Sequence, residues 1–122
     1  GSDGIPSVEG KPHPRLYGTF AKVLGTYARD ERLFSLEEAI HRMTGLPAQK
    51  FRLTTRGVIR AGAYADLVVF DPSTVADVGT YQDPRRYPPG IDYVIVAGEI
   101  AYGPGGATGN RAGRFLRRTQ PG

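Results

Sequence analysis

Cysteine is absent from this chain of 122 residues, and histidine occurs only at positions 13 and 41. Without cysteine the chain can form neither a disulfide bond nor a thiolate metal site. The two histidines do not stand at metal-ligand spacing, so this chain alone cannot assemble a histidine-based metal site. The lack of disulfides is typical of a cytoplasmic protein, and that is the location we expect.

Long apolar runs are missing as well. No stretch approaches the length of a membrane span, and no signal-peptide pattern opens the chain, so we expect no membrane association. The net charge is +4, and positive residues gather late in the chain, at Arg111, Arg114, Arg117 and Arg118. An arginine-rich tail can bind phosphates. Because no aromatic platform interleaves these arginines, we do not expect a nucleic acid as a partner.

The first half of the chain carries helical patterns. Apolar residues from Leu16 to Tyr27 recur at the spacing of one helix face. Ser35-Leu36-Glu37-Glu38 is a capping box that opens a second helix. We expect Gly45 to end this helix in the left-handed conformation, and a short further helix to run from Pro47 to Phe51.

The second half carries strand patterns. The β-branched run within Ala65–Asp71 predicts a strand that Pro72 stops. Its centre, Leu67–Phe70, is unbroken and apolar, which is typical of a strand covered on both faces. A loop follows from Pro72 to Gly90, and a loop of that length is either functional or packs on another part of the protein.

A hairpin closes the predicted sheet. Ile91–Val96 and Glu99–Tyr102 read as paired strands around the two-residue turn Ala97-Gly98. Arg56–Arg60 reads as a short strand or a turn, and one helical turn is expected near Arg114–Arg117. Helices first and strands afterwards define an α+β fold class. Three or four strands are few for a self-sufficient sheet, so we expect missing neighbours.

The residues with chemical potential lie at the N-terminal end. Asp3 stands on a glycine-flanked turn, where a carboxylate can accept and return a proton. The alternative is an ordinary turn, with Asp3 binding its own backbone amides. Arg15 can bind a carboxylate with two parallel hydrogen bonds, or it can pair with a carboxylate at a helix start. His13 could orient Asp3 or Arg15, or it is a plain surface histidine.

A family resemblance rests on these residues and on several segments downstream. The segments are Gly-Ser-Asp-Gly at 1–4, His-Pro-Arg at 13–15, Tyr-Gly-Thr-Phe at 17–20, Ser-Leu-Glu-Glu-Ala at 35–39, Met-Thr-Gly-Leu-Pro-Ala at 43–48 and Gly-Ala-Tyr-Ala-Asp-Leu-Val-Val-Phe-Asp-Pro at 62–72. In this order they resemble the N-acyl-D-amino-acid deacylases (D-aminoacylases) of the amidohydrolase superfamily. Ser-Asp-Gly followed by His-Pro-Arg is the part most specific to the deacylase branch.

The resemblance implies a fold and a domain division. Such enzymes have a metal-bearing (β/α)₈ barrel and a small β-sandwich domain. Residues 1–55 would be the C-terminal end of the barrel, and residues 56–122 the C-terminal part of the small β domain. Asp66 and Asp71 would then be structural residues of the β domain. Because the family's zinc is held mainly by histidines that this chain lacks, we expect a C-terminal fragment that is inactive alone.

The resemblance also implies roles for individual residues. Asp3 would be the catalytic carboxylate and a zinc ligand, Arg15 and Ser2 would bind the substrate, and His13 would support them from behind. The intact enzyme would hydrolyse an N-acyl-D-amino acid to a carboxylate and a D-amino acid. Its partners would be this substrate and the rest of the barrel or a complementing chain. The alternative is a non-catalytic interaction module that docks on a partner barrel.

Overall fold

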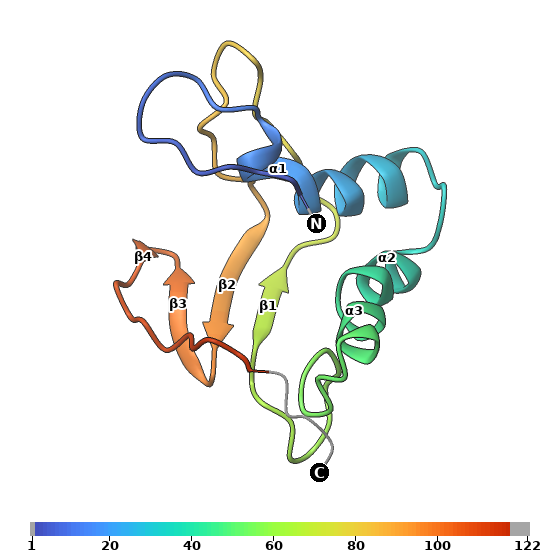
Figure 1. Cartoon of the computed structure of the whole chain (residues 1–122). Coiled ribbons are helices and arrows are strands. Elements are labelled where there is room, and N and C mark those ends of the chain that lie inside the picture. The colour runs from blue at the N-terminus through green and yellow to red at the C-terminus, as the bar shows by residue number, and fades with distance from the viewer. Residues whose placement is uncertain (1, 118–122) are drawn as a thin grey trace. The chain divides into compact units, whose positions relative to one another are not determined.

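Helices precede strands in the computed structural model, which describes residues 2–117 (Figure 1). The helical elements are α1 (Arg15–Lys22), the π-helix η1 (Val23–Asp30) that continues it, α2 (Leu36–Met43) and α3 (Gly45–Lys50). The strands are β1 (Leu67–Phe70), β2 (Ile91–Val96), β3 (Glu99–Gly103) and β4 (Gly106–Ala107). This order confirms the α+β class, whereas the origin of the elements in a barrel and a β-sandwich stays a prediction.

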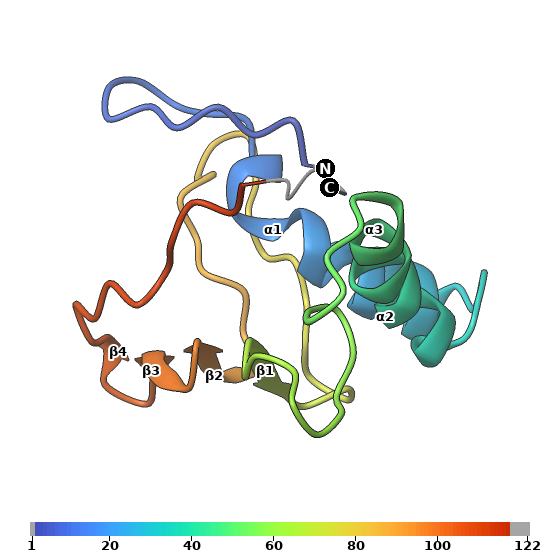
Figure 2. The ribbon, with the colours of Figure 1, turned by 60° about the horizontal axis from the view of Figure 1, so that its bottom comes forward.

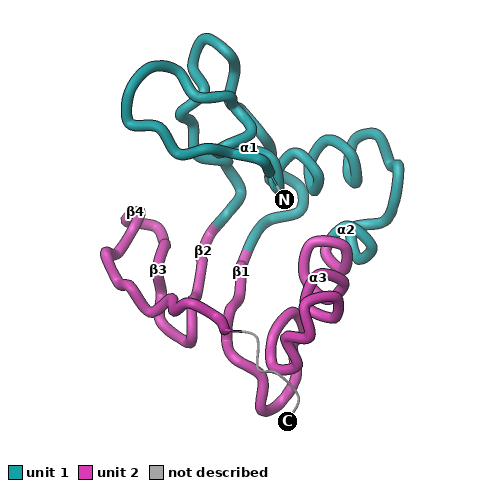
Figure 3. The backbone as a smooth tube through the Cα atoms, viewed as in Figure 1, with its two compact units in different colours: residues 1–39, 70–91 teal, residues 40–69, 92–122 magenta. Residues whose placement is uncertain are grey.

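The chain divides into two compact units, which Figure 3 colours separately. Unit 1 comprises Gly1–Ala39 and Phe70–Ile91, and unit 2 comprises Ile40–Val69 and Asp92–Gly122. Each unit is therefore built from two stretches that are distant in sequence. The domain boundary expected near residue 55 stays a prediction.

The core of unit 1 lies between the first helix and the start of the long loop. Ala21, Leu24 and Ala28 are buried along α1 and η1, and Val75 of the loop has no exposed surface. Gly25 permits this approach, because a Cβ there would collide with the backbone carbonyl oxygen of Val75. The apolar face of the first helix thus packs against Val75. This packing stabilises a helix that its glycines would otherwise weaken.

Two helix boundaries differ from the predictions. The first helix continues through Arg29 and Asp30 as a π-helix, although this polar stretch does not match the apolar pattern. Gly45 does not end α2 with a positive φ; it is the first residue of α3, which ends at Lys50. The predicted cap is confirmed, since the Glu38 N–H donates to Ser35 Oγ at 3.1 Å.

The strands form one sheet in the order β1-β2-β3-β4, and Figure 2 shows them side by side in this order. β3 pairs antiparallel with β2 and β4, and the β1 and β2 arrows point in opposite directions in Figure 1. The predicted hairpin turn is confirmed: Ala97 (φ 50°) and Gly98 (φ 85°) both have positive φ, as a type I′ turn requires. Sequence reasoning did not anticipate β4.

Val68 and Val69 of β1 are 53% and 46% exposed. The described part of the chain therefore does not supply the cover on both faces that this apolar strand calls for. Arg56–Arg60 forms no strand: residues 56–58 are a bend, and residues 59 and 60 have no regular secondary structure. The helical turn expected at Arg114–Arg117 is absent, since these residues have no regular secondary structure. Among the described helices, none has the length and apolar character needed to cross a membrane.

Candidate active site

Asp3 and Arg15 face each other at the surface of unit 1. Arg15 Nη2 lies 3.0 Å from Asp3 Oδ2, and the two side chains are 42% and 81% exposed. Asp3 has φ 53°, a conformation that aspartate tolerates better than most residues. Ser2 Oγ accepts a hydrogen bond from the N–H of Gly4 at 3.2 Å, and this bond stabilises the turn that carries Asp3. Gly1, the first residue of the motif, lies outside the described residues.

An exposed ion pair of this kind contributes about 0–1 kcal/mol of stability, because water and salt screen both charges. Stabilisation of the fold therefore does not account for the Asp3–Arg15 ion pair. What it does provide is a carboxylate and a guanidinium held together on an open surface. The two residues for which the sequence predicts proton transfer and carboxylate binding thus lie side by side, and these roles stay predictions.

His13 caps the first helix from outside. Its Nδ1 accepts the N–H of Arg15 at 3.0 Å, and its carbonyl accepts the N–H of Leu16 at 3.1 Å. Pro14, the N-cap residue between His13 and Arg15, is buried, and its side chain makes no capping hydrogen bond. His13 thus satisfies two amides of the first turn that have no partner inside the helix.

Tyr81 was not identified from the sequence, yet it contacts His13 across 68 positions. Tyr81 Oη lies 3.1 Å from His13 Nε2, and the two rings meet edge to face with centroids 5.1 Å apart. An isolated tyrosine in a proline-rich loop carries no periodic or motif signal. The one signal for Tyr81 in the sequence is the unusual length of the loop from Pro72 to Gly90, because a loop of that length is often functional.

The long loop makes one further contact with the N-terminal loop and one with α1. Arg85 Nη2 donates to the Gly10 carbonyl at 3.1 Å, and the ring of Tyr87 stands edge to face with Tyr17 at 5.6 Å. The two loops lie beside each other at the top of Figure 1, drawn in yellow and blue. A cleft of about 170 Å³ lies at the contact between His13 and Tyr81, and its lining also includes Arg15, Thr19, Lys22 and Asp77.

Arg29 and Asp71 fix the start of the long loop. Arg29 Nη1 donates to the carbonyls of Pro72 (3.2 Å) and Val75 (2.7 Å). Its hydrogen bond to Asp30 raises the pKa of Arg29 and lowers the pKa of Asp30. The hydroxyl and the backbone N–H of Ser73 both donate to Asp71 and lower the pKa of that carboxyl. These charges organise backbone, which agrees with the structural interpretation of Asp71.

Asp66 is likewise engaged with structure, in unit 2. Its Oδ1 accepts the N–H of Ala97 at 2.8 Å, and its other oxygen pairs with Arg56. The Arg56 guanidinium lies 4.2 Å from the ring centre of Tyr64. Asp66 therefore holds the β2–β3 turn, with a structural partner on each of its carboxylate oxygens.

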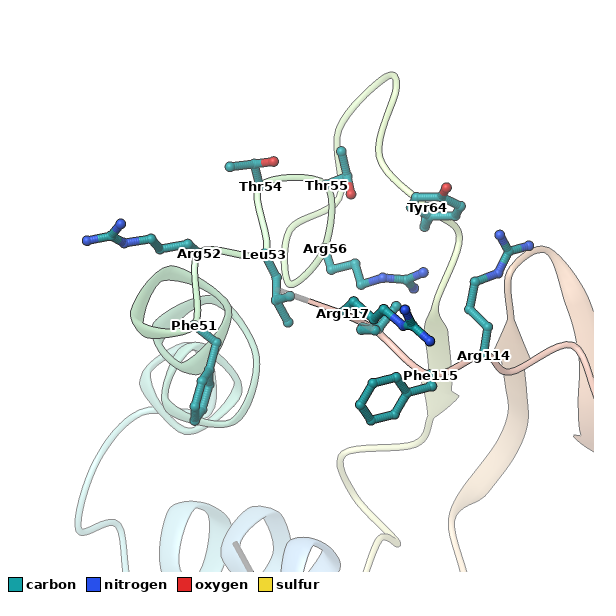
Figure 4. A pocket seen from close by; sticks show the side chains of 11 residues that line it. Phe51, Arg52, Leu53, Thr54, Thr55, Arg56, Tyr64, Arg114, Phe115 and Arg117 are labelled. Carbon is teal, nitrogen blue, oxygen red and sulfur yellow. The ribbon is translucent and has the colours of Figure 1, made fainter. Parts of the chain in front are cut away.

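Unit 2 also contains a cleft of about 300 Å³, which Figure 4 shows from close by. Arg56 and Arg117 both extend toward the side where Tyr64 and Arg114 lie, whereas Arg52 points away from the cleft. Arg114 also lines the cleft, so two arginines of the basic tail belong to it. Arg118, another arginine of that tail, lies outside the described residues.

Comparison with known proteins identifies the class to which this chain belongs. Residues 1–102 match the model of the amidohydrolase family. The chain therefore belongs to the amidohydrolase family.

Its relatives specify the branch as D-aminoacylase-like, which confirms the resemblance seen in the motifs. The chain is 54% identical over 119 residues to D-aminoacylase of Alcaligenes xylosoxydans xylosoxydans, covering 98% of this chain and 24% of that protein. It is 48% identical over 118 residues to N-acyl-D-glutamate deacylase of the same organism, covering 97% of this chain and 24% of that protein.

A crystal structure of D-aminoacylase superposes with a TM-score of 0.93 at 52% identity, over 97% of this chain and 25% of that one. The N-acyl-D-glutamate deacylase of Bordetella bronchiseptica, complexed with zinc and a phosphonate mimic of the tetrahedral intermediate, gives 0.89 at 48% identity, over 98% of this chain and 24% of that one. The chain thus spans about a quarter of the length of the relatives that it matches.

Zinc does not fit the described residues as a complete site. No group of three or more His, Asp or Glu side chains within residues 2–117 could hold a metal ion. Asp3 offers one carboxylate, which is 81% exposed and already paired with Arg15. A zinc site in a protein needs at least three protein ligands, so residues beyond those described here would have to supply the others.

Proposed function

We propose that this chain forms one wall of the active site of an enzyme that hydrolyses the amide bond of N-acyl-D-amino acids. The observation that carries the proposal is the Asp3–Arg15 pair, with 3.0 Å between Oδ2 and Nη2 on an exposed surface. D-aminoacylase and N-acyl-D-glutamate deacylase, two relatives near 50% identity, support the substrate class.

The chemistry follows from how the substrate is built. In an N-acyl amino acid the leaving nitrogen and the α-carboxylate are bonded to the same carbon. A guanidinium has five N–H donors, so Arg15 can keep Asp3 on one nitrogen and bind the α-carboxylate with the remaining donors. The positive charge between the two carboxylates also reduces their repulsion.

Asp3 is then adjacent to the scissile amide. Its carboxylate can take the proton of the attacking water as that water adds to the acyl carbonyl. It can return the proton to the nitrogen as the C–N bond breaks, which releases a carboxylate and a D-amino acid. Fixing the α-carboxylate at Arg15 restricts the orientation of the chiral carbon, so the same residue contributes to selection of the D configuration. Ser2 supports this wall by holding the turn that carries Asp3.

In this proposal the chain is the C-terminal portion of the enzyme, and the zinc ligands other than Asp3 lie in the remaining barrel. We expect the isolated chain to be inactive for that reason. The test is a hybrid enzyme, in which this chain replaces the homologous quarter of the Alcaligenes D-aminoacylase. Release of the D-amino acid from an N-acetyl-D-amino acid is measured, with the L isomer as the stereochemical control.

Two variants of the hybrid enzyme separate the roles. Asp3→Asn should lower kcat by about 10²- to 10⁴-fold, the contribution typical of a proton-transferring side chain. Arg15→Lys should mainly raise KM, by about 10-fold or more, because lysine cannot make two parallel hydrogen bonds to a carboxylate. The matched controls are Asp83→Asn and Arg86→Lys, another exposed acid and base of unit 1 lying 3.9 Å apart; neither should change kcat or KM.

The alternative function, a non-catalytic module that docks on a partner barrel, predicts a different result. The hybrid enzyme would then fold and turn over substrate, but Asp3→Asn would lower kcat no more than Asp83→Asn does. That result would overturn the catalytic role of this chain.

A further inference from the structure

The contact between Tyr81 and His13 joins the long loop to the helix turn that carries Arg15. Tyr81 Oη is 3.1 Å from His13 Nε2, and His13 Nδ1 is 3.0 Å from the backbone nitrogen of Arg15. Arg15 in turn reaches Asp3 at 3.0 Å. Tyr81 is therefore linked through His13 to the backbone of Arg15, and the side chain of Arg15 extends from there to Asp3.

The direction of these hydrogen bonds follows from the chemistry of the imidazole ring. A backbone N–H can only donate, so His13 Nδ1 must be the acceptor and carries no proton. In a neutral imidazole the proton is then on Nε2, which donates to Tyr81 Oη. The Arg15 amide thus sets the tautomer, and the hydrogen bond to Tyr81 Oη stabilises the ring in that state.

Tyr81 can do this because its own loop is braced. Thr80 and Asp83 are joined twice, by Thr80 N–H to the Asp83 carbonyl (3.0 Å) and by Asp83 N–H to Thr80 Oγ1 (2.9 Å). Arg85 adds its bond to the Gly10 carbonyl. Tyr81 therefore lies in a turn that hydrogen bonds hold in place, although 68% of the residue surface is exposed.

We propose that Tyr81 is a positioning residue for carboxylate recognition: through the Nε2–H tautomer of His13 it fixes the first turn of α1 and with it the place of the Arg15 guanidinium beside Asp3. This role rests on the proposed function of Arg15 and adds a residue that lies more than 60 positions away from it. Tyr81 itself does not touch the substrate or the reacting atoms in this assignment.

The first experiment uses the 122-residue chain as it is. The ¹⁵N spectrum of the imidazole rings reports which nitrogen carries the proton, and His41 is the internal reference because the chain has only two histidines. Tyr81→Phe should lower the fraction of His13 in the Nε2–H tautomer and leave His41 unchanged. Tyr87→Phe is the matched control: it lies on the same loop, and its hydroxyl makes no hydrogen bond with the described residues.

The second experiment uses the hybrid enzyme. Tyr81→Phe should raise KM for an N-acetyl-D-amino acid by about 3- to 10-fold, the size expected from one neutral hydrogen bond, with kcat changed less than about twofold. Tyr87→Phe should change neither constant. In a His13→Asn background the asparagine oxygen can still accept the Arg15 amide but cannot reach Tyr81, so adding Tyr81→Phe should raise KM no further.

The outcomes separate the two proposals. If Arg15→Lys leaves KM unchanged, the proposed carboxylate-binding role fails. If Arg15→Lys raises KM while Tyr81→Phe matches Tyr87→Phe in both KM and His13 tautomer, the positioning role fails and the proposed function stands. A full additional effect of Tyr81→Phe in the His13→Asn background would also overturn the route through His13.

Discussion

Val75→Ala tests how the long loop is anchored. Val75 has no exposed surface, and it is the largest fully buried side chain among the described residues. Around it lie Gly25 and Gly90, where an added Cβ would collide with the backbone of Val75. The backbone of Val75 is thus held between two closely approaching glycines, which leaves this segment little freedom to shift after a substitution.

The magnitude follows from two contributions. The substitution removes two carbon atoms, which costs about 1.6 kcal/mol of transfer free energy at ~0.8 kcal/mol for each. If the backbone does not relax, a void of ~50 Å³ adds about 1.2 kcal/mol at ~24 cal/mol per Å³. We therefore expect the free energy of unfolding to fall by about 2–3 kcal/mol, a large loss for so small a core.

The assay is urea unfolding followed by circular dichroism, together with hydrogen exchange at the amides of Asp71 and Val75. Both amides are hydrogen-bonded at the loop start, to the carbonyls of Gly90 and Asp71 respectively. Val8→Ala is the matched control, because Val8 is 96% exposed and its loss should change stability by less than about 0.5 kcal/mol. If Val75→Ala shifts the midpoint no more than Val8→Ala, the loop is not anchored by this side chain.

Three further predictions concern single residues. Gly90→Ala should lower stability by more than about 1–2 kcal/mol, because Gly90 has φ +83° and faces backbone at 2.5 Å, whereas Gly105→Ala has open space and should be neutral in the same urea assay. Asp71 has a lowered pKa in the folded state because Ser73 donates to its carboxylate, so its stabilising contribution is present above the unfolded pKa of about 3.9 and is lost as the pH falls through the folded value. Asp71→Asn should remove this part of the dependence of stability on pH. An unchanged loss of stability in acid would contradict the prediction. Ser35→Ala removes the acceptor for the Glu38 N–H and should cost about 1 kcal/mol, measured by thermal unfolding with Ser35→Asn as the variant that keeps the cap.

The parts of the fold that follow local rules could be predicted from the sequence. The turn at Ala97-Gly98 and the cap at Ser35 each depend on residues no more than three positions apart, and both are present. The prediction that Gly45 ends α2 is wrong, because Gly45 begins α3. A glycine can end one helix or begin the next, and the tertiary structure decides between these conformations.

The candidate site shows the same division. Asp3 and Arg15 could be named because the motifs around them are contiguous, and the structure places them 3.0 Å apart. Tyr81 could not be named, because its contact with His13 spans 68 positions and depends on how a loop without regular secondary structure folds back. Polar contacts between irregular segments leave no periodic trace in a sequence, so the site can be predicted only as far as its motif extends.

The span of these contacts also has a consequence for synthesis on the ribosome. The N-terminal loop is made first, but two of its contacts, at His13 and Gly10, are with Tyr81 and Arg85, 68 and 75 positions later. During translation these two contacts can therefore form only after Tyr81 and Arg85 have left the exit tunnel. The loop that carries Asp3 and His13 is therefore organised by residues that are translated well after it.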